Sequence, residues 1–283
     1  ISISGANTLV ATDMAKTSTT VYTYLRTVGA GDGTATVAMA TAQDTVGNTV
    51  TTAPTGGATH TIDNTNPTAA TLTAPSDAAF TNDATPTLTW TDGTDTNTVT
   101  AQVQIDNDIG FGSITESSTQ LASGTQTFTS AGLSPGTYYW RVVMTDAASN
   151  TSTSSVRSFT IDTTNPTAAI TYSAPGPYKS GSIVTITATF NEPVKDSPVP
   201  QISISGANTL AATNMVKTNS TVYTYSRTIA AGDGTATVAM ATAQDLAGNT
   251  ITAAPTGGAT HTIDNTNPTA AITYSAPGPY KSG

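Results

Sequence analysis

The sequence contains no cysteine among its 283 residues. This absence excludes a disulfide framework, thiolate catalysis and Cys-based zinc or iron–sulfur sites. It does not exclude export from the cell, because many exported bacterial proteins have no disulfides.

Positive charge is also scarce. The chain has 9 Lys and Arg residues against 18 Asp and Glu residues, for a formal net charge of −9 and a pI of about 4.3. Nucleic-acid binding is excluded, since it requires clustered basic side chains that replace counterions. A chain rich in acidic and amide side chains is instead suited to hard cations such as calcium.

Long hydrophobic runs and catalytic motifs are missing as well. No apolar stretch reaches the roughly 18–20 residues that span a bilayer, and no signal peptide is visible. The abrupt start at "ISISGANT" means that this says little about a parent protein. Because no G-x-S-x-G, H-E-x-x-H or phosphate-cradling glycine motif is found, we expect no enzyme here and no membrane contact within the segment.

What the sequence does contain is a repeat. The phrase "DNTNPTAA" occupies 63–70 and 264–271, and "DTTNPTAA" occupies 162–169. Residues 1–70 match 202–271 at 58 of 70 positions, and 267–283 repeat 165–181 letter for letter. Such self-similarity is typical of tandem arrays.

The repeat divides the chain into four parts, and we expect the sequence to be a window from a longer array. The predicted domains are the C-terminal part of one repeat (1–66), a different module of similar length (67–165), a complete repeat (166–267) and the start of the next (268–283).

Apolar residues recur with a period of two. In "IVTITATF" (183–190), Val184, Ile186, Ala188 and Phe190 fall on one face. Strands of this kind, with turn residues every 8–12 positions, predict β-sandwiches of roughly 100 residues. The predicted fold class is all-β, with tandem β-sandwiches in an extended array.

The middle module has its own pattern. Leu88 and Trp90 of "PTLTWT" are expected in the core, and Tyr138, Trp140, Val142 and Met144 alternate in "LSPGTYYWRVVMTD". This stretch resembles the fibronectin type III domain, and the resemblance implies that Tyr138 forms the tyrosine corner.

The flanking units carry a second resemblance through "FNEPV" (190–194), "GDGTATVAMATAQDLAGN" (232–249) and "IDNTNP" (263–268). They resemble the tandem Ig-like repeats (BIg type) of bacterial and archaeal surface adhesins. The resemblance implies an extracellular, cell-surface stalk, with calcium bound at the joints between modules.

Two acidic or amide clusters recur at each module end, and their oxygens are the type that calcium prefers. We expect the D-x-x-x-N turn and the exit cluster of one module to meet at the same pole of the sandwich. The candidate metal ligands are Asp44, Asn48, Asp63, Asn64, Asp146, Asn150, Asp162, Asp245, Asn249, Asp264 and Asn265. The alternative is that these residues form ordinary turns without an ion; the middle turn departs from the pattern, with Ser149 in place of Gly.

Other candidate sites have simpler interpretations. His60 and His261 occupy one position seen twice and are interpreted as structural. Asp32 and Asp233 are interpreted as turn residues, and Asp106, Asn107 and Asp108 as either an ion site or a plain loop. A Lys–Asn isopeptide bond involving Lys179 or Lys281 and Glu192 is not supported by any pattern in the sequence.

The leading functional hypothesis is a structural stalk or fibre segment whose partners are neighbouring repeats of the same long chain. One alternative is a surface-layer or filament subunit that packs laterally against like chains. Another is a module that binds a glycan or protein on a host or substrate surface through the loops 91–98 and 106–113 of the middle unit.

Overall fold

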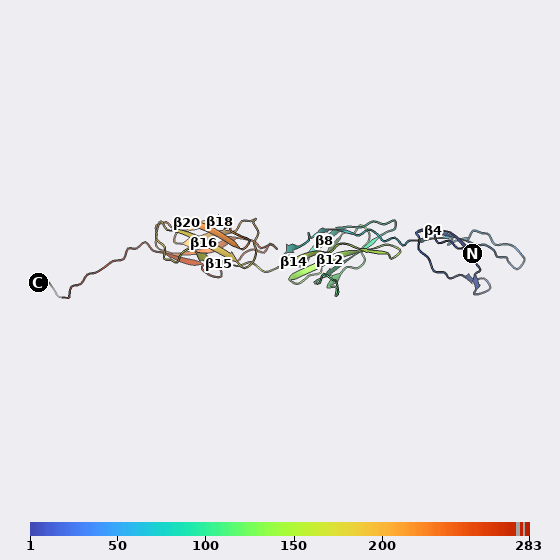
Figure 1. Cartoon of the computed structure of the whole chain (residues 1–283), viewed down its shortest axis with the longest axis horizontal. Coiled ribbons are helices and arrows are strands. Elements are labelled where there is room, and N and C mark those ends of the chain that lie inside the picture. Colours follow the sequence, from blue (N-terminus) through green and yellow to red (C-terminus); the bar gives the residue numbers. More distant parts are fainter. Residues whose placement is uncertain (276–277, 280) are drawn as a thin grey trace. The chain divides into compact units, whose positions relative to one another are not determined.

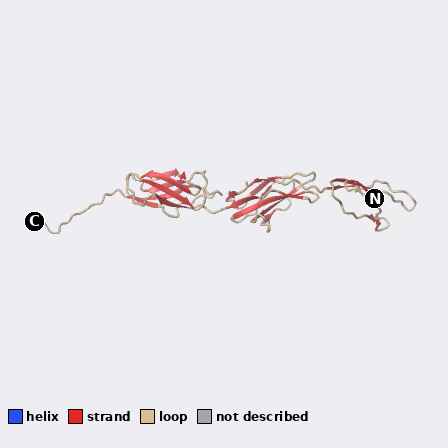
Figure 2. Ribbon diagram, viewed as in Figure 1, coloured by secondary structure: helices blue, strands red, loops and turns tan. Residues whose placement is uncertain are grey.

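The computed structural model describes residues 1–275, 278–279 and 281–283. Among them no residue lies in a helix, and strands form the only regular structure (Figures 1 and 2). No helix capable of spanning a membrane occurs in this part of the chain. Contacts divide the chain into two compact units: unit 1 comprises Ile1–Ala79, Thr85–Leu133 and Thr137–Phe159, and unit 2 comprises Phe80–Ala84, Ser134–Gly136 and Thr160–Gly283.

The N-terminal strands form only small sheets. One sheet has the order β1-β4-β5, and β2 pairs with β3. The buried core of the β1-β4-β5 sheet is limited to Ile3, Ala35 and Ile62. The strand bounds are β1 Ser2–Gly5, β2 Ala15–Lys16, β3 Tyr22–Thr23, β4 Gly33–Ala38 and β5 Thr59–Ile62.

The middle sandwich consists of two antiparallel sheets. One has the order β10-β9-β12-β14-β7 with β13 paired to β12, and the other has the order β11-β8-β6. Leu88 and Trp90 are buried, as are alternate residues of β12 from Tyr138 to Met144, which confirms the predicted inward faces. Tyr138 also stacks on Phe159, with ring centroids 5.9 Å apart. The bounds are β6 Thr71–Ala74, β7 Ala79–Thr81, β8 Thr87–Thr91, β9 Thr100–Asp106, β10 Glu116–Ser117, β11 Thr127–Thr129, β12 Gly136–Thr145, β13 Thr151–Thr153 and β14 Arg157–Ile161.

The complete repeat forms the second sandwich, from sheets ordered β15-β16-β20-β19 and β18-β17-β21-β22. Val184, Ile186, Ala188 and Phe190 of β16 all point into its core, as the period-two pattern predicts. The bounds are β15 Ala168–Tyr172, β16 Ile183–Phe190, β17 Gln201–Gly206, β18 Leu210–Asn214, β19 Val216–Lys217, β20 Val222–Thr228, β21 Gly234–Thr242 and β22 Thr260–Ile263.

The two near-identical copies differ in how well they are buried. Tyr22 is 50% exposed whereas its counterpart Tyr223 is 1% exposed, and Val28 is 51% exposed whereas Ile229 is 1% exposed. In the complete repeat, β20 pairs with β16, and residues 1–66 have no counterpart of β15 or β16. Burial of these shared positions therefore depends on the first two strands of the repeat.

Candidate functional site

Strand direction decides which loops of each sandwich lie near the incoming linker. We call this end, where the linker meets the first strand, the entry pole. In the middle sandwich β8 runs antiparallel to β6, so the loop after β8 returns to the entry pole. Strand β12 runs antiparallel to β9 and brings the turn 146–150 to the same end.

Three carboxylates meet at the entry pole of the middle sandwich. Asp63 comes from the linker, Asp95 from the loop after β8 and Asp146 from the turn after β12. One carboxylate oxygen from each lies within 4.8 Å of the others, and Asp146 is buried. Among the described residues, no Lys or Arg forms an ion pair with these groups. The site therefore concentrates negative charge without a protein cation to balance it.

The turn after β12 holds Asp146 by hydrogen bonds. Asp146 Oδ1 accepts from the backbone N–H groups of Ala148 and Asn150, both at 2.8 Å. Asn150 Nδ2 donates to Asp146 Oδ2 at 2.9 Å and to the main-chain oxygen of Asp63 at 3.1 Å. Burial pushes the pKa of Asp146 upward, but the hydrogen bonds from Asn150 and the turn outweigh it and lower the pKa overall. Asn150 thus joins the turn to the linker.

The complete repeat builds the same group from different residues. Asp162 comes from the linker, Glu192 lies two residues after the end of β16, and Asp245 lies in the turn after β21. Their oxygens also lie within 4.8 Å of one another. An antiparallel bridge between Val194 and Asp245 brings the turn beside Glu192.

Asn249 repeats the role of Asn150. Its Nδ2 donates to Asp245 Oδ2 and to the main-chain oxygen of Asp162, both at 2.7 Å. Asp245 Oδ1 accepts from the backbone of Gly248 and Asn249. Burial, and next the charges of Asp162 and Asp245, raise the pKa of Glu192. A raised pKa is the expected response of a carboxyl group that shares a confined space with like charges.

The predicted pairing of the clusters is wrong. The sequence reasoning grouped the D-x-x-x-N turn with the exit of its own module, Asp146 with Asp162 and Asp245 with Asp264. The structure groups Asp146 with Asp63 and Asp245 with Asp162. The reason is that further strands follow each turn, β13 and β14 in the middle sandwich and β22 in the complete repeat, and carry the chain to the opposite end.

The remaining predicted residues do not join a group of three carboxylates within the described residues. Asp44 and Asn48 reproduce the turn, with Asn48 Nδ2 donating to Asp44 Oδ2 at 2.7 Å. The hydrogen bond from the Asn48 side chain, followed by that from its backbone, lowers the pKa of Asp44.

Hydrogen bonds from Asn64 and Asn265 anchor the segment by which the chain leaves each copy of the repeat. The backbone N–H of Asn64 donates to Asp32 Oδ1 at 2.7 Å, and that of Asn265 donates to Asp233 Oδ1 at 2.6 Å. Asn265 Oδ1 also accepts from the backbone of Ser180 at 2.6 Å. Asp264 lies in this exit segment, where its backbone N–H donates to the oxygen of Tyr178.

Sequence reasoning did not recognise Asp95 and Glu192 as members of the acidic groups. From the sequence alone, Asp95 is part of a candidate ligand-binding loop, and Glu192 is a candidate partner in an isopeptide bond. Asp95 follows β8 and Glu192 follows β16. Each of these strands runs antiparallel to the first strand of its sandwich and so returns to the entry pole. Counting strand directions from the linker could have identified them.

The two loops proposed for glycan binding present no exposed aromatic side chain. Phe111, the single aromatic residue in 91–98 and 106–113, is 8% exposed, and the Arg141 guanidinium lies 4.0 Å from its ring centroid. Asp106 is fully buried and accepts from Asn107, Ser113 and Thr115. These contacts are those of a self-contained loop.

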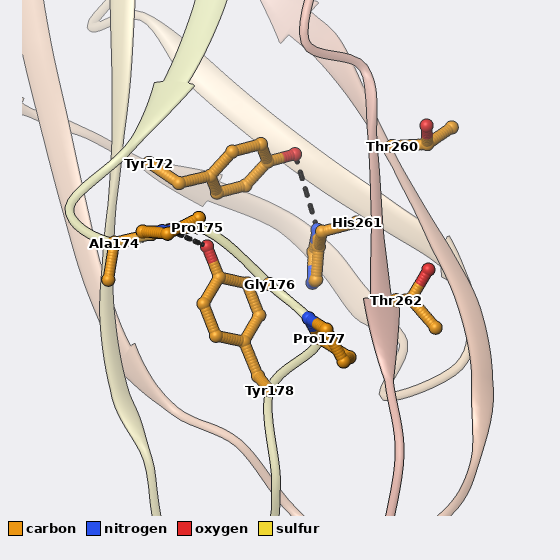
Figure 3. Close-up of a pocket in the computed structure, with 9 residues that line it drawn as sticks. All are labelled: Tyr172, Ala174, Pro175, Gly176, Pro177, Tyr178, Thr260, His261 and Thr262. Carbon is orange, nitrogen blue, oxygen red and sulfur yellow. Dashed lines mark hydrogen bonds between the residues drawn. The ribbon is translucent and has the colours of Figure 1, made fainter.

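His261 lies in an aromatic pocket of about 380 Å³ beside β22 (Figure 3). Its Nδ1 lies 3.2 Å from the Tyr172 hydroxyl, its ring packs edge-on against Tyr172 and Tyr178, and the Tyr178 hydroxyl donates to the Ala174 oxygen. Burial, followed by the charge of Arg227, lowers the pKa of His261, and burial with Tyr178 raises the pKa of Tyr172 to about 12. These contacts fit the structural interpretation of His261, while His60 is exposed.

The donor chemistry of the two acidic groups fits one class of ligand. Each offers three carboxylates, and neither contains a sulfur or imidazole ligand. Hard cations bind to oxygen ligands, and carboxylates supply the charge that sets their affinity. The two groups therefore suit a divalent cation such as calcium better than a transition metal.

Comparison with known proteins supports the fold. Residues 59–163 match the family model described as bacterial Ig-like domain. The search of curated proteins found no match.

Solved structures similar to the chain include fibronectin(III)-like modules of Clostridium thermocellum CbhA, at 15% identity over 69% of this chain and 92% of that one, with a TM-score of 0.36. A tetra-tandem repeat from the extending region of a large adhesion protein shares 18% identity over 82% and 56% of the two chains, with a TM-score of 0.29. A 1.5-MDa bacterial ice-binding adhesin shares 18% identity over 71% and 66%, with a TM-score of 0.39. The chain spans about two thirds or less of the two adhesin chains.

The sequence predicted an all-β fold of Ig-like and fibronectin III-like sandwiches. The two helix-free sandwiches of the described residues and the bacterial Ig-like match confirm the all-β, Ig-like part of this prediction. The resemblance to bacterial Ig-like domains is confirmed for residues 59–163. The exact domain limits remain predictions.

Proposed function

We propose that this chain is a structural segment of an extracellular stalk or fibre, in which calcium at each entry pole fixes the incoming linker to the sandwich. The observation that carries the proposal is the recurrence of the acidic group. Two sandwiches with different sequences each gather one linker carboxylate and two loop carboxylates within 4.8 Å.

The ligands in this proposal are the side chains of the two groups. Asp63, Asp95 and Asp146 would hold one ion, and Asp162, Glu192 and Asp245 the other. Calcium would supply positive charge to each set of carboxylates, and it usually takes six to eight oxygen ligands. Because one ligand in each set belongs to the linker, binding would resist movement of that linker.

The two turn amides have a positioning role in this scheme. The Nδ2 atoms of Asn150 and Asn249 face a carboxylate oxygen and a main-chain oxygen, so these amides act as donors. They hold the turn and the linker at the distance that a shared ion requires. Pro67 and Pro166, which follow soon after the linker acids, further restrict the backbone by fixing φ.

The stalk role rests on the repeat itself. A spacer needs only length and stiffness, so near-identical copies such as 1–70 and 202–271 suit it, whereas binding sites usually diversify. The bacterial Ig-like match supports a location at the cell surface. In this role the partners of each module are the neighbouring repeats of the same chain.

Calorimetric titration of calcium into the chelator-treated full chain tests the metal sites directly. We expect two sites, with Asp146→Asn removing one and Asp245→Asn the other. Asp13→Asn is the matched control, since Asp13 is exposed and belongs to neither group. Absence of binding at millimolar calcium would refute the calcium part of the proposal.

Small-angle scattering of the same samples tests the stiffening. Calcium should narrow the distribution of maximum dimensions in the parent chain and have a smaller effect in either variant. An unchanged distribution despite bound calcium would show that the ion stabilises the sandwich without stiffening the chain.

The lateral-packing alternative is tested by light scattering over a range of protein concentration. A monomer at all concentrations supports the stalk, and a mass that rises with concentration supports a filament subunit. The loops 91–98 and 106–113 do not support the glycan-binding alternative, because Arg141 covers the ring of Phe111.

A further inference from the structure

The chain contains two Asn-x-Ser/Thr signals for N-glycosylation, at Asn150 and Asn219. The motif alone does not show whether an asparagine is available for modification. We propose that Asn219 is an acceptor for an N-linked glycan in the folded protein and that Asn150 is not. The distinction rests on what each side-chain amide contacts.

Asn219 lies at the tip of the hairpin between β19 and β20. The backbone N–H groups of Thr218 and Asn219 both donate to the Val222 oxygen, at 2.9 and 3.2 Å, and close the turn. Thr218, Asn219 and Ser220 are all exposed. An acceptor on a hairpin tip is accessible to an enzyme without unfolding of the sandwich.

The third residue of the signal contacts the acceptor side chain directly. Thr221 donates to Asn219 Oδ1 from its backbone N–H at 2.9 Å and from its hydroxyl at 3.1 Å. Both hydrogen bonds use the amide oxygen, and no described residue accepts a hydrogen bond from Asn219 Nδ2. The nitrogen that must react is therefore left facing solvent.

The reaction uses a lipid-diphosphate-linked oligosaccharide as its co-substrate. Asn219 Nδ2 attacks the anomeric carbon of the first sugar, and the new N–C bond forms as the bond from that carbon to the diphosphate oxygen breaks. One amide proton passes to a base of the transferase, and the lipid diphosphate leaves. No oxidant or reductant is needed.

Asn150 carries the same signal in an unsuitable environment. Its Nδ2 donates to Asp146 Oδ2 and to the Asp63 oxygen, so glycosylation would break the link between the turn and the linker. The third residue, Ser152, lies in β13, and its hydroxyl is buried without a partner. Both nitrogen and hydroxyl are therefore unavailable for the reaction.

The first copy of the repeat offers a matched control. Ser18 stands at the position of Asn219, on the hairpin between β2 and β3, and the N–H groups of Thr17 and Ser18 donate to the Val21 oxygen at 2.9 and 3.1 Å. Thr20 occupies the position of Thr221. The substitution Ser18→Asn therefore creates a second signal on the same type of turn.

The test is treatment of the folded full chain with a purified oligosaccharyltransferase and its lipid-linked oligosaccharide. The enzyme must read the plain Asn-x-Ser/Thr signal, because Lys217 rather than an acid stands two residues before Asn219. It is first shown to modify short synthetic peptides of residues 147–155 and 216–224, which establishes that both signals are readable. Modification is then located by intact mass and peptide mapping.

We expect a mass increase of one glycan per chain, located at Asn219. Asn219→Gln and Thr221→Val should abolish it, Thr221→Ser should retain it, and Ser18→Asn should add a second glycan. A folded chain that stays unmodified at Asn219, or one modified equally at Asn150, would overturn the proposal. Unchanged circular dichroism of each variant confirms that the turn is tested in a folded chain.

Discussion

Asn249 and Asp162 lie 87 residues apart in the sequence, yet the Asn249 side chain donates a 2.7 Å hydrogen bond to the main-chain oxygen of Asp162. Asn150 and Asp63 are also separated by 87 residues and make the equivalent bond at 3.1 Å. The two sandwiches differ in sequence, but each uses one amide to connect its last tight turn to the segment by which the chain enters.

Replacement of Asn249 by Ala should destabilise unit 2 by about 2 kcal/mol, since it leaves a carboxylate and a main-chain oxygen without their donor. Asn249 is largely buried, so water cannot fully replace the lost bonds. Urea unfolding of the full chain measures the change. Asn214→Ala, which removes an exposed hydrogen bond to Gln201, is the control and should cost much less. Equal losses in both variants would contradict the role of Asn249.

Calcium binding at the Glu192 group should weaken as the pH falls. The raised pKa of Glu192 means that the folded, ion-free protein takes up a proton there at a higher pH than a free glutamate does. Calcium must displace that proton, so affinity falls at and below the raised pKa. Titration calorimetry at pH 7.5 and 5.0, in two buffers of different ionisation enthalpy, measures both affinity and proton release. Glu192→Gln should abolish the proton release at this group, and a pH-independent affinity would refute the linkage.

The stability of unit 2 should decrease as the pH falls below about 6.5 because of His261. Its pKa is lowered in the folded state, so the unfolded chain binds a proton that the folded chain does not. Stability is then present above the unfolded pKa and is lost below it, at up to about 1.4 kcal/mol per pH unit for one proton.

The measurement is thermal unfolding of the parent and of His261→Gln at several pH values. The difference between the two isolates His261 from other titrating groups such as Glu192. His60→Gln is the control, because His60 is exposed in the incomplete copy. If the parent and His261→Gln differed in stability by the same amount at every pH, this role of His261 would be contradicted.

Ser149→Gly should stabilise unit 1 by about 1 kcal/mol. Ser149 has a φ of 71°, in the left-handed region where side chains are strained, and the equivalent Gly248 has a φ of 104°. Removal of the side chain relieves this strain. The reverse change, Gly248→Ala, should cost about 1–3 kcal/mol. Chemical denaturation of both variants provides the test, and a destabilised Ser149→Gly would show that the serine side chain makes a favourable contact.

The sequence predicted the strands and their inward faces well because the period of two is a local property. Val184, Ile186, Ala188 and Phe190 lie on one buried face because successive side chains of any strand alternate. The turn acids were also identified locally, since Asp146 and Asp245 occur in recognisable D-x-x-x-N turns. The end of the sandwich at which each acid lies is a non-local property, because it depends on the direction of every strand before it.

Burial in the first copy shows the same limit. Tyr22 and Tyr223 occur in the same short sequence, "TVYTY", but only Tyr223 is buried. What differs is the presence of β16, which pairs with β20 from a distant part of the sequence. The burial of Phe111 could not be predicted for a related reason, because Phe111 lies in a loop and the Arg141 that covers it belongs to β12, distant in the sequence.

The way the two acidic groups are divided between linker and sandwich has a genetic consequence. The phrase "DNTNPTAA" is identical at 63–70 and 264–271, so recombination within it would join the end of one repeat to the beginning of another. The linker acid lies within the exchanged phrase, and the loop acids travel with the following module. Gain or loss of whole repeats at this phrase would therefore keep a linker acid in front of each following module.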